Sequence, residues 1–266
     1  MLKSYHSKSE NAVYNYYVTT LITLKEGFLI KNAELVLFDL DNTLFPFNDL
    51  WLIANKQIFN HSSYAEDIAY DEFLKIYTYY DKKFWSEHSR GEITLDELRQ
   101  LRLIESLKYF KKNITTKEAH EYFLAFFDII IQHIKPNIIL NDHLNKLKKW
   151  VNIGILTNGK NLEQMTKIAR LELNKVFESN IFISEDIGSE NPDSVAFLKV
   201  THMLNIKPEH TIFVGDSWEN DVSGSLNVGM KPIWFNGDKN IIDKNIEVIN
   251  SSIEGLVESL ITRVKR

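Results

Sequence analysis

A short apolar run that ends in two aspartates constrains the fold of this chain more than any other feature. Residues 34–38 read Glu-Leu-Val-Leu-Phe, and Asp39 and Asp41 come just after them. An apolar run that stops abruptly at charged residues is typical of a strand buried on both faces of a parallel sheet. Because side chains alternate along a strand, Asp39 and Asp41 are expected on the same side of its exposed carboxyl end. Two carboxylates at that spacing repel, so they need a cation, a shared proton or water to hold them there.

The second half of the chain contains further short apolar runs, which alternate with amphipathic helical segments. These runs lie at residues 151–156, 180–184, 211–214 and 231–235. Strands that alternate with helices at this spacing are joined by right-handed crossovers into a parallel sheet with helices on both faces. We therefore predict an α/β protein whose core is a Rossmann-like, doubly wound parallel sheet.

The long segment between the first two predicted strands shows helical spacing and almost no strand pattern. Two helix starts carry capping boxes, in which a threonine side chain and a glutamate side chain three residues later each bind the other's backbone amide. These are Thr94 with Glu97 and Thr115 with Glu118. The segment is predicted to be an inserted α-helical domain of about four helices.

The predicted organisation therefore has three parts. Residues 1–33 are an N-terminal extension, in which residues 12–30 contain a β-prone run. Residues 34–48 and 150–266 form the sheet core, and residues 49–149 form the helical insert.

The overall composition excludes several classes of partner and chemistry. A net charge of −5 and a pI near 5.9 argue against nucleic acid or an anionic membrane surface, but allow a small phosphorylated metabolite. The absence of cysteine excludes disulfides, thiolate metal sites and cysteine nucleophiles. The eight histidines lack ligand spacing, so a metal is expected on oxygen ligands. With no leader pattern and no run long enough to span a bilayer, we expect a cytoplasmic protein without a membrane partner. The sequence carries no signal of an oligomeric state.

Polar residues follow the predicted strands at the sheet edge where α/β proteins bind their ligands. Thr157 and Asn158 end the second strand, and Asp216 ends the fourth, with Asp221 five residues further on. Together with the first strand, this ordered set resembles the haloacid dehalogenase superfamily over about residues 34–260. The first, second and fourth motifs of that superfamily are matched by Asp-Leu-Asp-Asn-Thr at 39–43, Ile-Leu-Thr-Asn-Gly at 155–159 and Gly-Asp-Ser-Trp-Glu-Asn-Asp at 215–221.

The helical insert resembles the C1 cap of that superfamily, which closes over the active site. Trp85, residues 90–94, residues 97–98 and residues 102–103 are similar to the cap of a branch that holds nucleotidases and related phosphatases of small metabolites. The second aspartate of the first motif also separates the phosphatases from the dehalogenases, which need no acid for a departing halide. The resemblance therefore favours phosphoryl transfer.

The resemblance and the chemistry of the two motif aspartates imply the same roles. Asp39 is expected to attack phosphorus and form an aspartyl-phosphate, and Asp41 to protonate the leaving oxygen and then deprotonate the attacking water. Mg²⁺ is expected on Asp39, the backbone carbonyl of Asp41 and Asp216. Asp221 would orient the waters of the metal or bind it, although an acid stabilised by a helix N-terminus explains it equally well. The Thr157 hydroxyl and the Asn158 amide would hold the phosphoryl oxygens.

The sequence departs from the superfamily at its third motif. The lysine that normally precedes Pro-Asp is replaced by Asn191, whose amide could still bind phosphate but carries no charge. Lys160, or the cap residues Arg90 or Arg102, would then supply the cation. A solvated loop lysine and helix-surface or packing arginines are the ordinary explanations of these three residues.

The leading hypothesis is a Mg²⁺-dependent phosphatase of a small phosphorylated metabolite, either a nucleoside monophosphate or a sugar phosphate, acting through an aspartyl-phosphate. Two alternatives stay open. A phosphomutase would use the same two aspartates. A weak or inactive protein that binds a phosphometabolite would explain the loss of charge at Asn191.

Overall fold

The computed structural model describes residues 32–238 and 246–265, and a six-stranded parallel sheet forms the centre of this part of the chain. The strand order is β3-β2-β1-β4-β5-β6, and every neighbouring pair is parallel. The strands are β1 Leu35–Phe38, β2 Asn152–Thr157, β3 Ile181–Ile183, β4 Thr211–Gly215, β5 Lys231–Phe235 and β6 Glu247–Ile249. The predicted fold class is confirmed. Sequence reasoning did not find β6, which has three residues at the edge of the sheet, and the β-prone run at 12–30 lies outside the described residues.

The central strand β1 is buried along its whole length because β2 and β4 flank it and helices cover both of its faces. Its side chains alternate between two apolar clusters. Val36 and Phe38 belong to one cluster, and Leu35 and Leu37 belong to the other. The unbroken apolar run is thus explained by burial on two faces rather than one.

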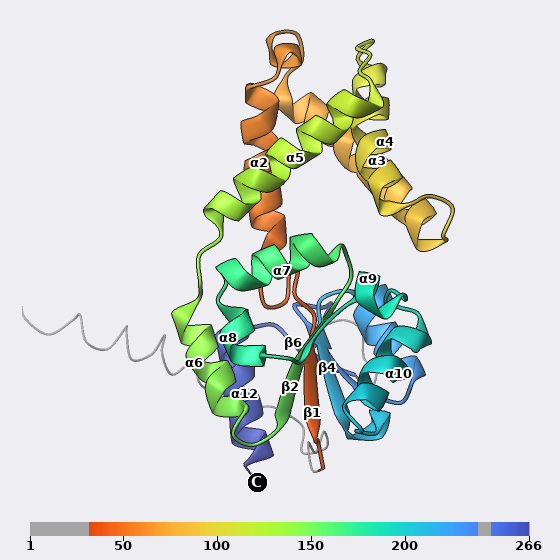
Figure 1. Ribbon diagram of the computed structural model, residues 1–266. Coiled ribbons are helices and arrows are strands. Elements are labelled where there is room, and N and C mark those ends of the chain that lie inside the picture. The colour runs from red at the N-terminus through yellow and green to blue at the C-terminus, as the bar shows by residue number, and fades with distance from the viewer. Residues whose placement is uncertain (1–31, 239–245, 266) are drawn as a thin grey trace, which may run out of the picture.

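Helices lie on both faces of the sheet (Figure 1). One face is covered by α6 Ile138–Leu147, α7 Asn161–Arg170, α8 Leu173–Phe177 and α12 Ile253–Val264. The other is covered by α9 Ser184–Ile187, α10 Ser194–Met203, the π-helix η3 Trp218–Ser223 and α11 Gly224–Asn227, with the 3₁₀ turn η2 Pro208–His210 before β4. This arrangement places the carboxyl ends of the strands at one edge, which faces the inserted helices (Figure 1).

The inserted helices stand above that edge as a separate layer (Figure 1). They are α2 Phe47–Asn60, the 3₁₀ turn η1 Ser63–Glu66, α3 Tyr70–Ser89, α4 Leu95–Tyr109 and α5 Thr116–His133. Both predicted capping boxes are present, at the first turns of α4 and α5. Stacked rings of Phe59, Phe73 and Tyr77 form the centre of the layer, with ring centroids 4.5 and 5.2 Å apart. We call α2–α5 the cap.

The helix α6 lies inside the segment predicted as the helical insert, but it packs beside the sheet. Leu140, Leu144 and Leu147 are buried in the same apolar cluster as β1 and α12. Among the described residues, no single helix is long and apolar enough to cross a membrane, whereas α5 and α6 together meet the length and composition criteria but are bent by 78°.

Candidate active site

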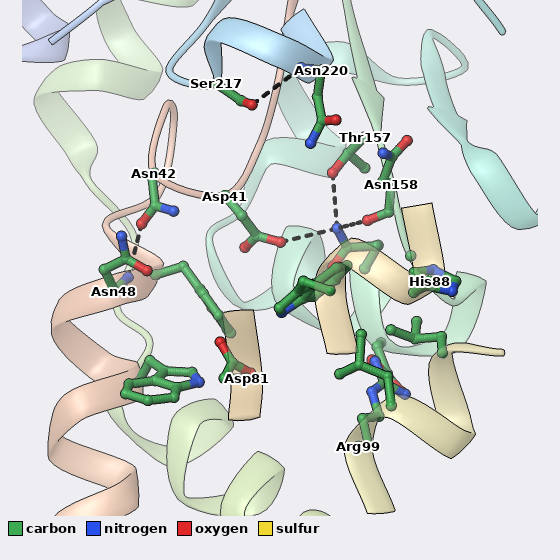
Figure 2. Close-up of a pocket in the computed structure, with 18 of the residues that line it drawn as sticks. Asp41, Asn42, Asn48, Asp81, His88, Arg99, Thr157, Asn158, Ser217 and Asn220 are labelled. Carbon is green, nitrogen blue, oxygen red and sulfur yellow. Dashed lines mark hydrogen bonds and ion pairs between the residues drawn. The ribbon is translucent and has the colours of Figure 1, made fainter. Parts of the chain in front are cut away.

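A cavity of about 690 Å³ lies between the carboxyl edge of the sheet and the cap. Its walls combine residues at or just beyond the carboxyl ends of β1, β2 and β4 with residues of α2, α3, α4, α5 and α7. Figure 2 shows part of this lining. Most of the predicted site residues line it: Asp39, Asp41, Arg102, Thr157, Asn158, Asn191, Asp216 and Asp221. The structure therefore brings together residues that are up to 182 positions apart in the chain, from Asp39 to Asp221.

Three carboxylates meet at one end of this cavity. Asp39, Asp216 and Asp221 each offer an oxygen, and these atoms all lie within 4.8 Å of one another. Burial, followed by the charges of Asp221, Asp41 and Asp216, raises the pKa of Asp39 well above its ordinary value. Burial is also the main cause that raises the pKa of Asp216 to about 6 and that of Asp221 to about 7.

Local backbone structure holds this acidic cluster in place. The Ser217 backbone amide donates to Asp221 Oδ2 at 2.9 Å, and the Trp234 indole donates to the Asp216 carbonyl at 2.8 Å. A Cβ at Gly215 would overlap the Asp221 carboxylate, so the last residue of β4 must be glycine for Asp221 to come so close. The cluster consists of hard oxygen ligands packed with excess negative charge, which fits a dication such as Mg²⁺.

Asp41 has partners of its own, which come from α7. Lys167 Nζ lies 2.8 and 2.5 Å from the two Asp41 carboxylate oxygens, and its side chain is 5% exposed. Gln164, one turn earlier, donates to Asp41 Oδ2 at 3.1 Å. The aspartate predicted as the acid and base is therefore held by a buried cation and a buried amide.

Gln164 also connects Asp41 to the end of β2. Its amide nitrogen lies 2.8 Å from Thr157 Oγ1 and 2.9 Å from the Asn158 carbonyl, so three oxygens converge on it (Figure 2). Thr157 accepts this hydrogen bond and can still donate its own hydroxyl hydrogen. Sequence reasoning missed both Gln164 and Lys167 because polar residues three and four apart on a helix are typical of a solvent-exposed face.

The predicted phosphate ligands Asn158 and Asn191 bind each other. Asn158 Nδ2 donates to the Asn191 carbonyl and Asn158 Oδ1 accepts from the Asn191 amide, both at 2.8 Å. The Asn158 side chain thus fastens the loop that carries Asn191. Asn191 Oδ1 is buried, and among the described residues it has no hydrogen-bond partner.

The structure does not bring two of the proposed substitute cations to the cavity. Lys160 Nζ lies 3.6 Å from Asp96 and 3.3 Å from Glu185, and these charges raise its pKa. Arg90 is exposed and binds Glu92 at 2.6 Å. Both residues are paired with carboxylates outside the cavity, so neither supplies a charge to it.

Arg102 does line the cavity, but it is already paired. Its guanidinium lies 2.7 Å from Asp81 and 5.4 Å from the centre of the Tyr77 ring. Arg102, predicted as a substitute cation, is therefore a buried cap residue whose charge is already paired with Asp81 of the cap.

Ion pairs join the cap to the sheet core along one side of the cavity. Arg99 of α4 binds Glu163 of α7 through two contacts of 2.7 and 2.5 Å, and its guanidinium lies 4.2 Å from the centre of the Phe123 ring. Lys160, the N-cap residue of α7, adds a second link through its ion pair with Asp96 of α4. The helix α7 therefore contacts both the cap and Asp41.

A doubly wound sheet that presents four aspartates beneath a helical cap defines a hydrolase of the haloacid dehalogenase type. The family model for haloacid dehalogenase-like hydrolases matches residues 33–229, and this chain belongs to that family. The predicted resemblance and the prediction of an enzyme are confirmed.

Named relatives cover most of the chain. A glyceraldehyde 3-phosphate phosphatase of Pyrococcus furiosus is 30% identical over 77% of this chain and 82% of its own length. The pyrimidine 5'-nucleotidase PynA of Streptococcus pneumoniae is 26% identical over 76% of this chain and 81% of its own. The structure also resembles the HAD-hydrolase YfnB of Bacillus subtilis, solved bound to magnesium, with a TM-score of 0.73, 23% identity and coverage of 86% of this chain and 99% of that one.

Proposed function

We propose that this hydrolase is a Mg²⁺-dependent phosphatase that acts on a small phosphorylated metabolite, either a nucleoside monophosphate or a sugar phosphate. A glyceraldehyde 3-phosphate phosphatase and a pyrimidine 5'-nucleotidase among its relatives support this substrate class. The observation that carries the proposal is that the two aspartates after β1 have different surroundings. Asp39 lies in the acidic cluster, whereas Asp41 lies against Lys167 and Gln164.

The metal would be held by Asp39, Asp216 and Asp221, together with the backbone carbonyl of Asp41. Their oxygens are the ligands that Mg²⁺ prefers. Burial, and after it the repulsion between neighbouring carboxylates, raises the pKa of all three groups, and a bound cation would offset both effects. When bound, Mg²⁺ neutralises negative charge on the phosphoryl oxygens.

The two aspartates of β1 would share the covalent chemistry. An Asp39 carboxylate oxygen forms a bond to phosphorus while the bond from phosphorus to the leaving oxygen breaks, which yields an aspartyl-phosphate. Asp41 gives a proton to that leaving oxygen and then takes a proton from the water that attacks phosphorus. Attack by this water breaks the bond between phosphorus and Asp39 and restores the free carboxylate.

The phosphoryl oxygens would be held by the residues at the end of β2. Thr157 has a hydroxyl hydrogen to donate, because its oxygen already accepts from Gln164 at 2.8 Å. Asn158 contributes chiefly by holding the Asn191 loop in place, since both ends of its amide are bound to the Asn191 backbone.

The test is hydrolysis of an aryl phosphate and of a panel of metabolites by the purified chain with and without Mg²⁺. The panel should contain triose phosphates, hexose phosphates and nucleoside monophosphates. Replacement Asp39→Asn should lower turnover by at least about a thousandfold. Asp128→Asn, which changes an exposed aspartate of α5, is the matched control. Turnover that survives Asp39→Asn would contradict the assigned nucleophile, and ligand-dependent thermal stabilisation without turnover would favour the binding-protein alternative.

A further inference from the structure

The cavity contains several cations, and most of them are neutralised by neighbours. Arg99 is paired with Glu163 and Arg102 with Asp81. Lys82 is exposed on the cap helix α3. Lys167 differs from these because its partner is Asp41, one of the two aspartates proposed to carry the chemistry.

The surroundings of Lys167 make its charge effective. The residue is 4% exposed, and its ammonium lies 4.8 Å from the centre of the Phe47 ring. Charges act more strongly on each other where water is excluded, so a buried lysine interacts more strongly with an anion than an exposed one does. Asn191, by contrast, offers only an uncharged amide.

The donors of Lys167 are not exhausted by Asp41. An ammonium has three N–H groups, and two of them face the two Asp41 oxygens at 2.8 and 2.5 Å. Within the described ranges, no other acceptor contacts it. One N–H is therefore left for a further oxygen in the cavity.

We propose that Lys167 supplies, from α7, the positive charge that binds the transferring phosphoryl group and that position 191 lacks. The inference rests on the proposed phosphatase function and names a further residue of the same site. Lys167 lines the same cavity as Asp39 and Asp41, so its remaining N–H is available to a phosphoryl group carried by Asp39. The lysine forms and breaks no covalent bond and keeps its proton throughout.

A rival explanation is that Lys167 only holds Asp41 in position. The two explanations differ once the Asp41 charge is removed. In an Asp41→Asn background, a lysine that serves only Asp41 has no further effect on anion binding, whereas a lysine that binds phosphate still has one. The comparison isolates the contact between Lys167 and phosphate.

The experiment measures the affinity of inorganic phosphate in the presence of Mg²⁺ by calorimetry, using the full chain. Asp41→Asn is compared with the double variant Asp41→Asn/Lys167→Met. We expect phosphate to bind about tenfold or more weakly to the double variant, because that variant loses a hydrogen bond between charged groups, which is stronger than one between neutral groups. Arg170→Met in the same background removes an exposed charge from the same helix and should change the affinity less than about twofold. Equal phosphate affinity with and without Lys167 would overturn the proposal.

Two further variants keep the result interpretable. Lys167→Arg retains the charge and should bind phosphate more tightly than Lys167→Gln, which should lose affinity as Lys167→Met does. Thermal unfolding of each variant shows whether the chain is still folded, and the glutamine variant replaces the methionine variant if that one is not. Phosphate binding that depends on Lys167 in a chain without turnover would remove the proposed hydrolysis and retain this inference. Turnover that depends on Asp39, together with phosphate binding that does not depend on Lys167, would retain the proposed hydrolysis and remove this inference.

Discussion

The ion pair between Arg99 and Glu163 is expected to set how firmly the cap closes over the aspartates proposed to carry the chemistry. Its two contacts of 2.7 and 2.5 Å join α4 of the cap to α7 of the core, next to Gln164. We predict that Arg99→Met, which keeps much of the apolar stem and removes the charge, shifts the cap toward an open position. The substrate would then bind to a smaller fraction of closed molecules.

The size of this effect follows from the surroundings of the pair. The side chains are 12% and 19% exposed, which places the pair between a surface ion pair and a fully buried one. Surface pairs contribute about 0.2–1 kcal/mol, and breaking a buried pair costs about 3–5 kcal/mol. We take about 1–2 kcal/mol for closure, which corresponds to a factor of about 5–30 in an equilibrium constant.

The assay is steady-state hydrolysis of the best substrate at two salt concentrations. Arg99→Met should raise KM by about 5–30-fold and leave kcat within about threefold. The wild-type KM should rise with salt more steeply than that of the variant, because screening weakens the same pair. Lys117→Met, which removes an exposed ion pair with Glu121 on α5, is the control and should behave as wild type. A value of kcat/KM for Arg99→Met within about twofold of wild type would refute the reasoning.

Three further predictions concern the site and its support. Gln164→Leu removes the amide on which three oxygens converge and should lower kcat/KM about tenfold, measured with the same substrate. Gly215→Ala should push Asp221 away and weaken Mg²⁺ activation at least about tenfold, measured by titration of activity with Mg²⁺. Thr94→Ala removes a capping box and should cost about 1 kcal/mol of unfolding free energy, seen as a loss of about 2–4 °C in Tm by circular dichroism. A normal Mg²⁺ titration for Gly215→Ala, or an unchanged Tm for Thr94→Ala, would contradict the respective structural explanation.

The sequence by itself determined five of the six described strands and the acidic residues at the edge of the sheet. Buried strands of a parallel sheet are apolar on both faces, so β1 and β4 are recognisable from their own residues alone. Parallel strands end at a common edge, and this places Asp39 and Asp216 together although 177 positions separate them. The capping boxes were also predictable from the sequence, because the two residues of each box lie within one helical turn.

Only the tertiary structure decided which cation reaches the aspartates. Lys160 is the N-cap residue of α7 and Lys167 lies two turns further along that helix, and periodicity alone gives no reason to prefer either. The cap provides Asp96 beside Lys160 and helps to keep that lysine outside the cavity, whereas Asp41 from a distant strand end accepts Lys167. The partner of a long charged side chain is chosen by whichever opposite charge the fold brings near it. That choice depends on contacts between segments more than 60 residues apart, which no local pattern encodes.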